Sequence, residues 1–385
     1  MEGAVHPDFA SVARALQRVI PPDGSEGGAA VAVYHRGEPV VDIWVGHSDR
    51  NGTPWQRDTM AMSFSTTKGV VSTVIHRLVD RGELHWDDPV ANVWPEFAAG
   101  GKERITVRDL LTHRAGLHSI RTLVEHTDEL LDWPHMIDLL AAVRPDRPPH
   151  AETGYHAVTF GWLAGEVIRR VTGLTVSQAV ERELSQPLGL KSLFIGAPSA
   201  ERHRAAELLI DDTVKNRLDR FFRLLDRYDN TRPAVDALVV EDFLDLATTG
   251  RIHDAEIPAA NGVFTARDLA KMYSALASPG TLGGEPFLSA KTLAEATRIQ
   301  THGRDAVLFA DVRWRLGYHA IPTFAGVPPR AFGHLGFGGS GAWGDQDTGL
   351  GVAMVLNKLS GTLLGDTRFL RVGGAALRSA RSRPT

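Results

Sequence analysis

Ser65-Thr66-Thr67-Lys68-Gly69-Val70-Val71 is the stretch that decides the fold of this 385-residue chain. Apolar residues recur at helical spacing from Val70 to Val79, which predicts a helix with one buried face. Gly82 is a suitable residue to end that helix, because glycine adopts the left-handed conformation at helix C-termini. Residues three apart on a helix share a face, so we expect the Lys68 amine within hydrogen-bond distance of the Ser65 hydroxyl.

Ser65 and Lys68 have the chemistry of a nucleophile and its base. A hydroxyl is a poor nucleophile at neutral pH and needs a base beside it. The free N–H groups at a helix N-terminus favour developing negative charge, and burial of Lys68 would lower the pKa of its amine. The sequence contains no other Ser-x-x-Lys. A capping serine beside a solvated lysine would give the same four residues, so both interpretations stay open for the motif alone.

Strand-like segments lie at both ends of the chain. Residues 29–34 and 40–45 are β-rich and are joined by a linker with the glycine of a hairpin loop. After Pro258 the strand pattern returns at residues 312–318, 342–344 and 350–356. Helical patterns at residues 9–19 and 367–379 flank these runs. The sequence therefore predicts an α/β fold in which an antiparallel sheet is built from both termini and flanked by helices.

The middle of the chain has mostly helical patterns. Thr106-Val107-Arg108-Asp109 is typical of a capping box, and residues 160–171 form a helical pattern that stops at Gly173. Residues 200–249 alternate charged and apolar residues at helical spacing, which indicates a helical cap or ordinary helix packing. We expect residues 1–83 and 259–385 to form the sheet domain, and residues 84–258 to form an inserted all-helical subdomain.

Composition excludes several classes of function. A formal charge of −4 argues against nucleic-acid binding, which needs a basic surface. The chain has no cysteine, no run of about 18 apolar residues and no signal-peptide pattern, so we expect a cytoplasmic protein without membrane contact. His-Glu-x-x-His, Gly-x-Ser-x-Gly and P-loop patterns are absent, so we expect neither a metal nor a cofactor.

Three motifs together resemble a known family. Ser65-Thr66-Thr67-Lys68, Tyr155-His156-Ala157 and His334-Leu335-Gly336 follow the order and rough spacing of the motifs of class C β-lactamases and their relatives. The chain looks most like the family VIII carboxylesterases on the penicillin-binding-protein/β-lactamase fold. Segments 110–117, 258–262 and 334–340 also resemble that group, and the resemblance is weakest over residues 200–249.

The resemblance implies a role for each matched position. Ser65 would attack the substrate carbonyl, with Lys68 and Tyr155 sharing the proton transfers. The backbone N–H groups of Ser65 and Phe337 would hold the oxyanion, and substrate would bind beside His334, Gly336 and Gly338. Which of Lys68 and Tyr155 is the first base stays open, and a phenol would need nearby cations to lower its pKa for that role.

Two positions depart from the β-lactamase pattern. Ala157 replaces an asparagine that holds the acylamino side chain of the substrate, and His334 replaces a lysine that helps to dock a carboxylate. Both changes weaken β-lactam recognition and leave the acyl-transfer residues in place. The resemblance thus implies a serine carboxylesterase that hydrolyses short-chain esters through a Ser65 acyl-enzyme. The alternatives are a β-lactamase or D-amino-acid peptidase, an acyltransferase, and a non-catalytic binding protein.

Overall fold

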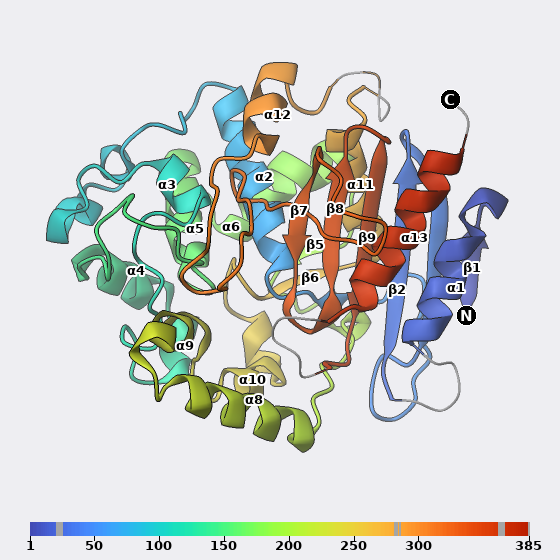
Figure 1. Ribbon diagram of the computed structural model, residues 1–385, viewed down its shortest axis with the longest axis horizontal. Helices are drawn as coiled ribbons and strands as arrows, with labels where there is room; N and C mark the ends of the chain where they lie inside the picture. Colours follow the sequence, from blue (N-terminus) through green and yellow to red (C-terminus); the bar gives the residue numbers. More distant parts are fainter. Residues whose placement is uncertain (21–25, 281–283, 285, 361–365, 384–385) are drawn as a thin grey trace.

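A six-stranded antiparallel sheet forms one side of the molecule, with strand order β1-β3-β2-β9-β8-β7 (Figure 1). The computed structural model describes residues 1–20, 26–280, 284, 286–360 and 366–383. Strands from the two ends of the sequence meet where β2 pairs with β9, so the sheet is built from both termini as predicted. The strand bounds are β1 Glu2–Val5, β2 Gly28–His35, β3 Glu38–Gly46, β7 Ala331–Leu335, β8 Gly341–Asp345 and β9 Leu350–Leu356.

Alternation along β2 separates the two faces of this sheet. Ala29, Val31 and Val33 face the core under the terminal helices α1 (Ala10–Val19) and α13 (Arg368–Ser382). These two helices lie side by side over one face of the sheet (Figure 1). Ala30 and Ala32 face the opposite core, which contains α2 (Thr66–Asp80) and α11 (Ala266–Ala277). The sheet is therefore covered by helices on both faces.

Glycines bring α11 close to the sheet. A Cβ added at Gly351 would lie 2.4 Å from the carbonyl oxygen of Ala270. The Thr265 side chain accepts a hydrogen bond from the Asp268 amide and so begins this helix. Neither α11 nor the edge strand β1 was predicted from the sequence.

A second, three-stranded sheet connects the sheet domain to the helical part. Its strand order is β4-β6-β5, with bounds Ala61–Met62, Gly262–Phe264 and Leu193–Ile195. β5 lies inside the stretch that was expected to be helical throughout. Since β4 leads directly into α2, this small sheet fixes where α2 begins.

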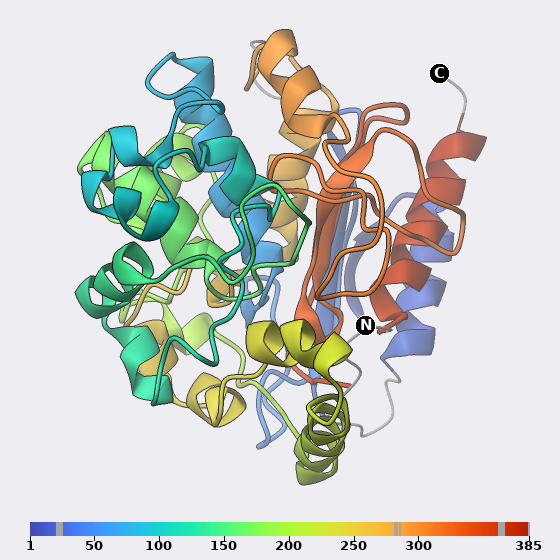
Figure 2. The same ribbon diagram turned by 60° about the vertical axis from the view of Figure 1, so that its left-hand side comes forward.

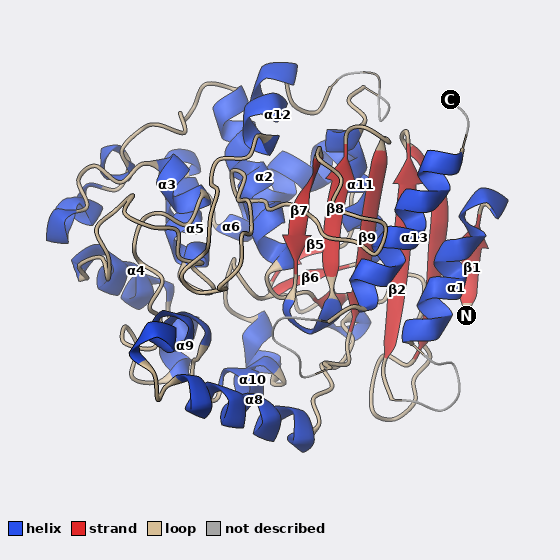
Figure 3. Cartoon of the chain, viewed as in Figure 1, coloured by secondary structure: helices blue, strands red, loops and turns tan. Residues whose placement is uncertain are grey.

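The remaining elements are mainly helices, which gather on the side away from the large sheet (Figure 3). The capping box at Thr106 and the end of α5 at the left-handed Gly173 are present as predicted, and a second capping box at Thr175 begins α6. Residues 200–249 form three helices at the lower edge of the molecule (Figure 2). The helix bounds are α3 Val107–Leu111, α4 Trp133–Ala142, α5 Phe160–Thr172, α6 Val176–Val180, α7 Gln186–Leu188, α8 Asp212–Leu225, α9 Arg232–Leu238, α10 Phe243–Ala247 and α12 Ala290–Thr297.

The strand predicted at residues 312–318 does not form. Arg313 has a φ of +53° and Gly317 a φ of +71°, which an extended strand does not accommodate. The amide of Trp314 donates to the Thr301 side chain at 3.2 Å instead of to a neighbouring strand. The pattern of alternating residues here belongs to a loop that folds over the end of β7.

One hydrophobic core extends from the large sheet into the helical part, and it includes Tyr34, Leu78, Leu163, Leu269 and Val355. A division of the chain at residues 83 and 258 stays a prediction. Among the described residues, no helix is both long enough and apolar enough to cross a membrane.

Candidate active site

Ser65 lies at the N-cap of α2, at a sharp turn between β4 and the helix. The preceding residue, Phe64, has a φ of +45°, a conformation that non-glycine residues rarely adopt. The turn is held because the Ser63 amide donates to the Gly262 carbonyl at 2.8 Å and the Thr67 hydroxyl donates to the Phe64 carbonyl at 2.5 Å. The strained turn therefore presents the Ser65 side chain at the start of the helix.

The Lys68 side chain is fully buried, and its amine meets Ser65 as the spacing predicted. Nζ lies 3.1 Å from Ser65 Oγ, 2.6 Å from the Ala157 carbonyl oxygen and 3.1 Å from the Ala259 carbonyl oxygen. Burial lowers the pKa of Lys68 well below its ordinary value. A neutral amine has two N–H groups and one lone pair. Since the two carbonyls take the N–H groups, the lone pair is left for the Ser65 hydroxyl.

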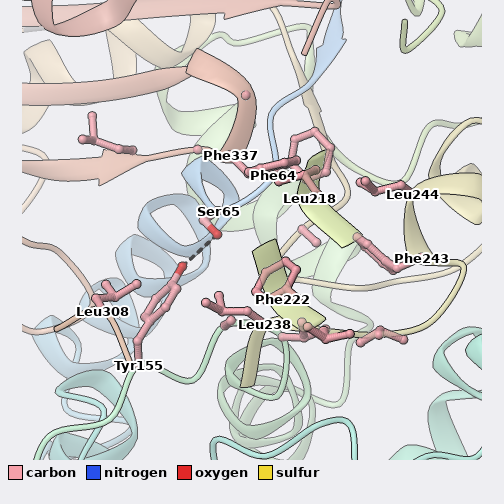
Figure 4. Close-up of a pocket in the computed structure, with 18 of the residues that line it drawn as sticks. Phe64, Ser65, Tyr155, Leu218, Phe222, Leu238, Phe243, Leu244, Leu308 and Phe337 are labelled. Carbon is pink, nitrogen blue, oxygen red and sulfur yellow. Dashed lines mark hydrogen bonds between the residues drawn. The ribbon is translucent and has the colours of Figure 1, made fainter. Parts of the chain in front are cut away.

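The Tyr155 hydroxyl lies on the other side of the same oxygen. It donates to Ser65 Oγ at 2.8 Å (Figure 4). Burial raises the pKa of Tyr155, so the phenol is neutral and acts as a hydrogen-bond donor. Tyr155 would be the first base only if nearby cations lowered its pKa, whereas burial has the largest effect on this phenol and raises its pKa.

Two residues that the sequence analysis did not single out position Tyr155. Trp314 stacks on the Tyr155 ring at 5.3 Å between centroids, with an angle of 13° between the planes. Asp305 accepts from the Tyr155 amide at 3.2 Å and from Trp314 Nε1 at 3.0 Å. Oδ1 of Asp305 also accepts from the backbone amides of Val307 and Leu308, at 2.9 and 3.0 Å. Nothing in the local sequence distinguishes Asp305 from other acidic loop residues.

Several buried histidines pack around this group. His156, the residue after Tyr155 in the second motif, is fully buried. The His156 amide donates to His113 Nδ1 at 3.1 Å, and the His113 ring lies 5.0 Å from the Tyr155 ring. His113 belongs to segment 110–117, whose resemblance to the family was the one sequence signal for it. These contacts fix the backbone on the C-terminal side of Tyr155.

His334 lies beside the site as a neutral ring. Its Nδ1 donates to the Leu335 carbonyl at 2.8 Å, and burial lowers the pKa of His334 well below its ordinary value. Nε2 has no hydrogen-bond partner in the part of the chain that the structure describes. A free acceptor atom is thus available at the position where a β-lactamase has a lysine.

The end of β7 runs past Ser65 and into a short 3-10 turn, η9 (Phe337–Gly339). Across the described residues, neither the Ser65 amide nor the Phe337 amide donates a hydrogen bond. A Cβ at Gly336 would lie 2.4 Å from the Ser63 carbonyl oxygen, and one at Gly338 would lie 2.0 Å from Leu359 Cδ2. The packing of the protein itself therefore requires glycine at both positions.

A cavity of about 1460 Å³ opens beside Ser65 and Tyr155. Ala157 and Phe337 line it together with all three predicted substrate-binding positions, His334, Gly336 and Gly338. Each lysine and arginine on the described lining lies in an ion pair. These pairs are Arg121 with Asp226, Lys215 with Asp245, Arg223 with Asp219, and Arg313 with Asp311.

Comparisons with known proteins agree with this geometry. The beta-lactamase family model matches residues 10–376. The chain is 40% identical to the esterase/beta-lactamase LipL of Mycobacterium tuberculosis over 373 residues, covering 94% of this chain and 84% of the relative. It is 29% identical to the esterase EstB of Burkholderia gladioli over 360 residues, covering 86% of each chain.

Solved structures give the same result. A penicillin-binding protein homolog from Caulobacter crescentus superposes with a TM-score of 0.85 at 37% identity, covering 98% of this chain and 99% of the other. A family VIII carboxylesterase superposes with a TM-score of 0.83 at 37% identity, with the same coverage. The family match, these relatives and the shared fold show that the chain belongs to the beta-lactamase family and is a serine hydrolase.

Proposed function

We propose that this protein hydrolyses carboxylic esters, including short-chain esters, through an acyl-enzyme on Ser65. One observation supports this above all others. Ser65 Oγ lies 3.1 Å from the Lys68 amine and 2.8 Å from the Tyr155 hydroxyl, so a nucleophile, a base and an acid share one oxygen. The substrate in this proposal is a small-molecule ester, and no metal or cofactor takes part.

Acylation begins when Ser65 Oγ bonds to the ester carbonyl carbon and its proton passes to the neutral Lys68 amine. The carbonyl electron pair moves onto oxygen, where the amides of Ser65 and Phe337 donate to it. One such donor contributes about 10²–10³ in turnover in related acyl-transfer sites. Lys68 is the first base in this scheme, because its lone pair faces Ser65 while the Tyr155 phenol keeps its proton.

Departure of the alcohol completes acylation. The bond between the carbonyl carbon and the alcohol oxygen breaks, and the leaving alkoxide takes the proton of Tyr155. The phenolate recovers a proton from the Lys68 ammonium, so both groups return to their starting forms. A water then takes the place of the alcohol and gives a proton to the pair formed by Lys68 and Tyr155. Its oxygen bonds to the acyl carbon, and Ser65 leaves with that proton.

An uncharged ester fits the cavity better than a β-lactam. Ala157 has no amide to hold an acylamino group, and the neutral His334 has no charge for a carboxylate. The lining lysine and arginine side chains named above already have carboxylate partners. A negatively charged substrate would therefore meet no free cation among them.

The test is turnover of p-nitrophenyl acetate and butyrate by the purified protein and by Ser65→Ala. We expect Ser65→Ala to abolish turnover while circular dichroism stays unchanged, and Ser199→Ala, at an exposed serine, to retain it. Mass spectrometry after treatment with a fluorophosphonate should locate the adduct on Ser65. Full activity in Ser65→Ala, or an adduct on another residue, would overturn the proposal.

Hydrolysis of β-lactams is a second candidate, favoured by the name of the relative LipL, an esterase/beta-lactamase. Turnover of the β-lactam nitrocefin distinguishes β-lactam hydrolysis from ester hydrolysis. We expect a kcat/KM for nitrocefin far below that for p-nitrophenyl butyrate, since the two recognition residues are replaced. Efficient nitrocefin turnover with little esterase activity would assign the site to β-lactams instead.

We also propose that the protein acts in the cytoplasm. The absence of cysteine supports this, because a reducing compartment offers no use for disulfides. Fractionation of the producing cells, with the esterase activity followed into each fraction, tests it. Activity in the medium or the membrane fraction would contradict this location.

A further inference from the structure

The cavity beside Ser65 continues beyond the reacting groups into an apolar chamber under the helical cap. Phe64 and Phe337 form its wall next to Ser65, with their rings edge to face at 5.3 Å between centroids. Helices α8, α9 and α10 form the opposite wall (Figure 4). The side chains that these helices contribute are Leu218, Phe222, Leu238, Phe243 and Leu244.

The wall formed by the cap is held in place by ion pairs. Lys215 on α8 pairs with Asp245 on α10. Arg121, in the loop before α4, pairs with Asp226 at the end of α8 at 2.9 Å. Arg251, after α10, pairs with Asp128 at 2.9 Å. The first pair connects α8 to α10 within the cap, and the other two connect Asp226 and Arg251 to the segment before α4, so the wall belongs to the fold itself.

The chamber lies on the acyl side of the reaction. In the proposed mechanism Tyr155 protonates the departing alcohol, so the alcohol must leave beside the Tyr155 hydroxyl. Tyr155 and Leu308 lie on one side of Ser65 in Figure 4, while Leu218, Phe243 and Leu244 lie on the other. An acyl group bound to Ser65 and directed away from the alcohol therefore enters the apolar chamber.

We propose that this chamber is a binding site for an uncharged, apolar acyl chain longer than a butyryl group. The inference rests on the proposed ester hydrolysis and names its preferred acyl group. An acetyl group leaves most of the apolar lining in contact with water, whereas a longer chain covers it. The cavity volume of about 1460 Å³ exceeds the roughly 300–1,000 Å³ of common ligand pockets, so space does not limit the chain.

Burial of each added methylene predicts a rise in kcat/KM. Complete transfer of one methylene from water raises the constant about fourfold, and partial transfer raises it about twofold. The short-chain esters of the proposed function are then the small members of a series that improves toward the octanoate. A charged acyl chain gains nothing, because the lining cations are already paired.

The experiment compares two series of esters in solution, below the concentration at which they form micelles. The first varies the acyl chain, from p-nitrophenyl acetate through butyrate and hexanoate to octanoate. The second varies the alcohol, from ethyl acetate through butyl acetate to octyl acetate. We expect kcat/KM to rise by about two- to fourfold per methylene in the acyl series and to change little in the alcohol series.

Two neighbouring phenylalanines on α8 supply a matched pair of variants. Phe222 lines the cavity, whereas Phe221 is 44% exposed and does not line it. We expect Phe222→Ser to lower the ratio of octanoate to acetate kcat/KM about tenfold or more. Phe221→Ser, with the same chemical change, should leave that ratio as it is in the parent protein. Leu244→Gln provides a second lining variant in case Phe222→Ser does not fold, which circular dichroism would reveal.

The outcomes separate this inference from the proposed function. If no ester in either series is hydrolysed, the proposed function fails. If acetate and butyrate are hydrolysed but the acyl series is flat or falls, the proposed function stands and the acyl site is overturned. A rise confined to the alcohol series would place the apolar chain on the leaving group and would also overturn the acyl site. Equal effects of the Phe221 and Phe222 variants would overturn it as well.

Discussion

Lys68 is the residue whose burial most changes its chemistry. A lysine in water is a cation at neutral pH and a poor base. Here the side chain is fully buried, and its amine contacts two carbonyl oxygens and Ser65 Oγ. Desolvation disfavours the charged form, and carbonyl dipoles compensate less than a carboxylate would. The result is an amine whose neutral form is favoured by burial, held one helical turn from the nucleophile.

The pH dependence of kcat/KM follows from the lowered pKa of Lys68. The base works only when unprotonated, so activity should fall as the pH decreases through that lowered pKa and should be constant through neutrality. Lys68→Arg puts a permanent positive charge in place of the Lys68 amine and cannot accept the proton, and we expect it to lose about 10²–10⁴ in kcat/KM. A profile from about pH 4 to pH 10 checks this. Activity that climbs toward the ordinary lysine pKa would show that the amine is protonated at neutrality.

Tyr155→Phe should reveal the acid role through the leaving group. The variant keeps the ring that stacks on Trp314 and removes only the hydroxyl. An alkyl alcohol needs a proton to depart, whereas p-nitrophenolate leaves without one. We therefore expect a loss of about 10²–10⁴ for ethyl butyrate and a loss of about tenfold or less for p-nitrophenyl butyrate. Steady-state kinetics with both esters measure the contrast, and equal losses would mean that Tyr155 does not protonate the leaving group.

The sequence predicted the three groups around Ser65 Oγ but not those that support them. Ser65 and Lys68 follow from helical periodicity, and Tyr155 follows from the order of three motifs. Asp305 and Trp314 lie in loops, where no periodicity links a residue to its position in space. His156 follows Tyr155 in a loop, and nothing in its neighbouring sequence indicates that it is fully buried.

At the scale of elements, helical periodicity and longer β-rich runs predicted the helices and strands correctly, whereas a short alternation of apolar and polar residues did not. The helix after Ser65, the hairpin of β2 and β3 and the last strand β9 formed where their patterns indicated. Residues 312–318 alternate as a strand would, yet the Leu316 and Gly317 amides donate to carbonyls at the ends of α12 and α3 and not to a neighbouring strand. β1 was not predicted, because a four-residue edge strand is too short to give a clear sequence pattern.

The loop from Asp305 to Trp314 acts as a single support for Tyr155, and Asp305→Asn tests this element. The asparagine side chain has one accepting oxygen in place of two, so it cannot accept from every backbone and indole N–H group that Asp305 contacts. We expect kcat/KM for ethyl butyrate to fall about 10-fold to 100-fold, since a small displacement of Tyr155 suffices. The loss should be smaller for p-nitrophenyl butyrate, as for Tyr155→Phe.

Asp347→Asn is the matched control, because Asp347 lies in the exposed turn between β8 and β9. It should leave the kinetics with both esters unchanged. A loss in Asp305→Asn that is equal for the two esters would indicate general disruption of the site and would contradict a positioning role toward Tyr155.

At the scale of the whole molecule, Ser65 lies where the large sheet, the small sheet and the helical part meet. α2 packs against α5 in the helical part and against β7 in the sheet. One core contains residues from both parts, such as Tyr34 and Leu163. The catalytic geometry thus depends on the packing of the two parts against each other, and neither part supplies all the groups around Ser65.

This shared core predicts that the helical part and the sheet unfold together. A core that spans two structural units makes the exposure of one costly without the other, so urea should produce a single transition. We expect the same midpoint from far-UV circular dichroism, from tryptophan fluorescence and from the loss of fluorophosphonate labelling at Ser65. The fluorescence reports on both parts, because Trp162 lies in α5 and Trp343 in β8. Labelling lost well before the fluorescence changes would show that the site opens locally, and two separate transitions would show that residues 84–258 form an independent unit.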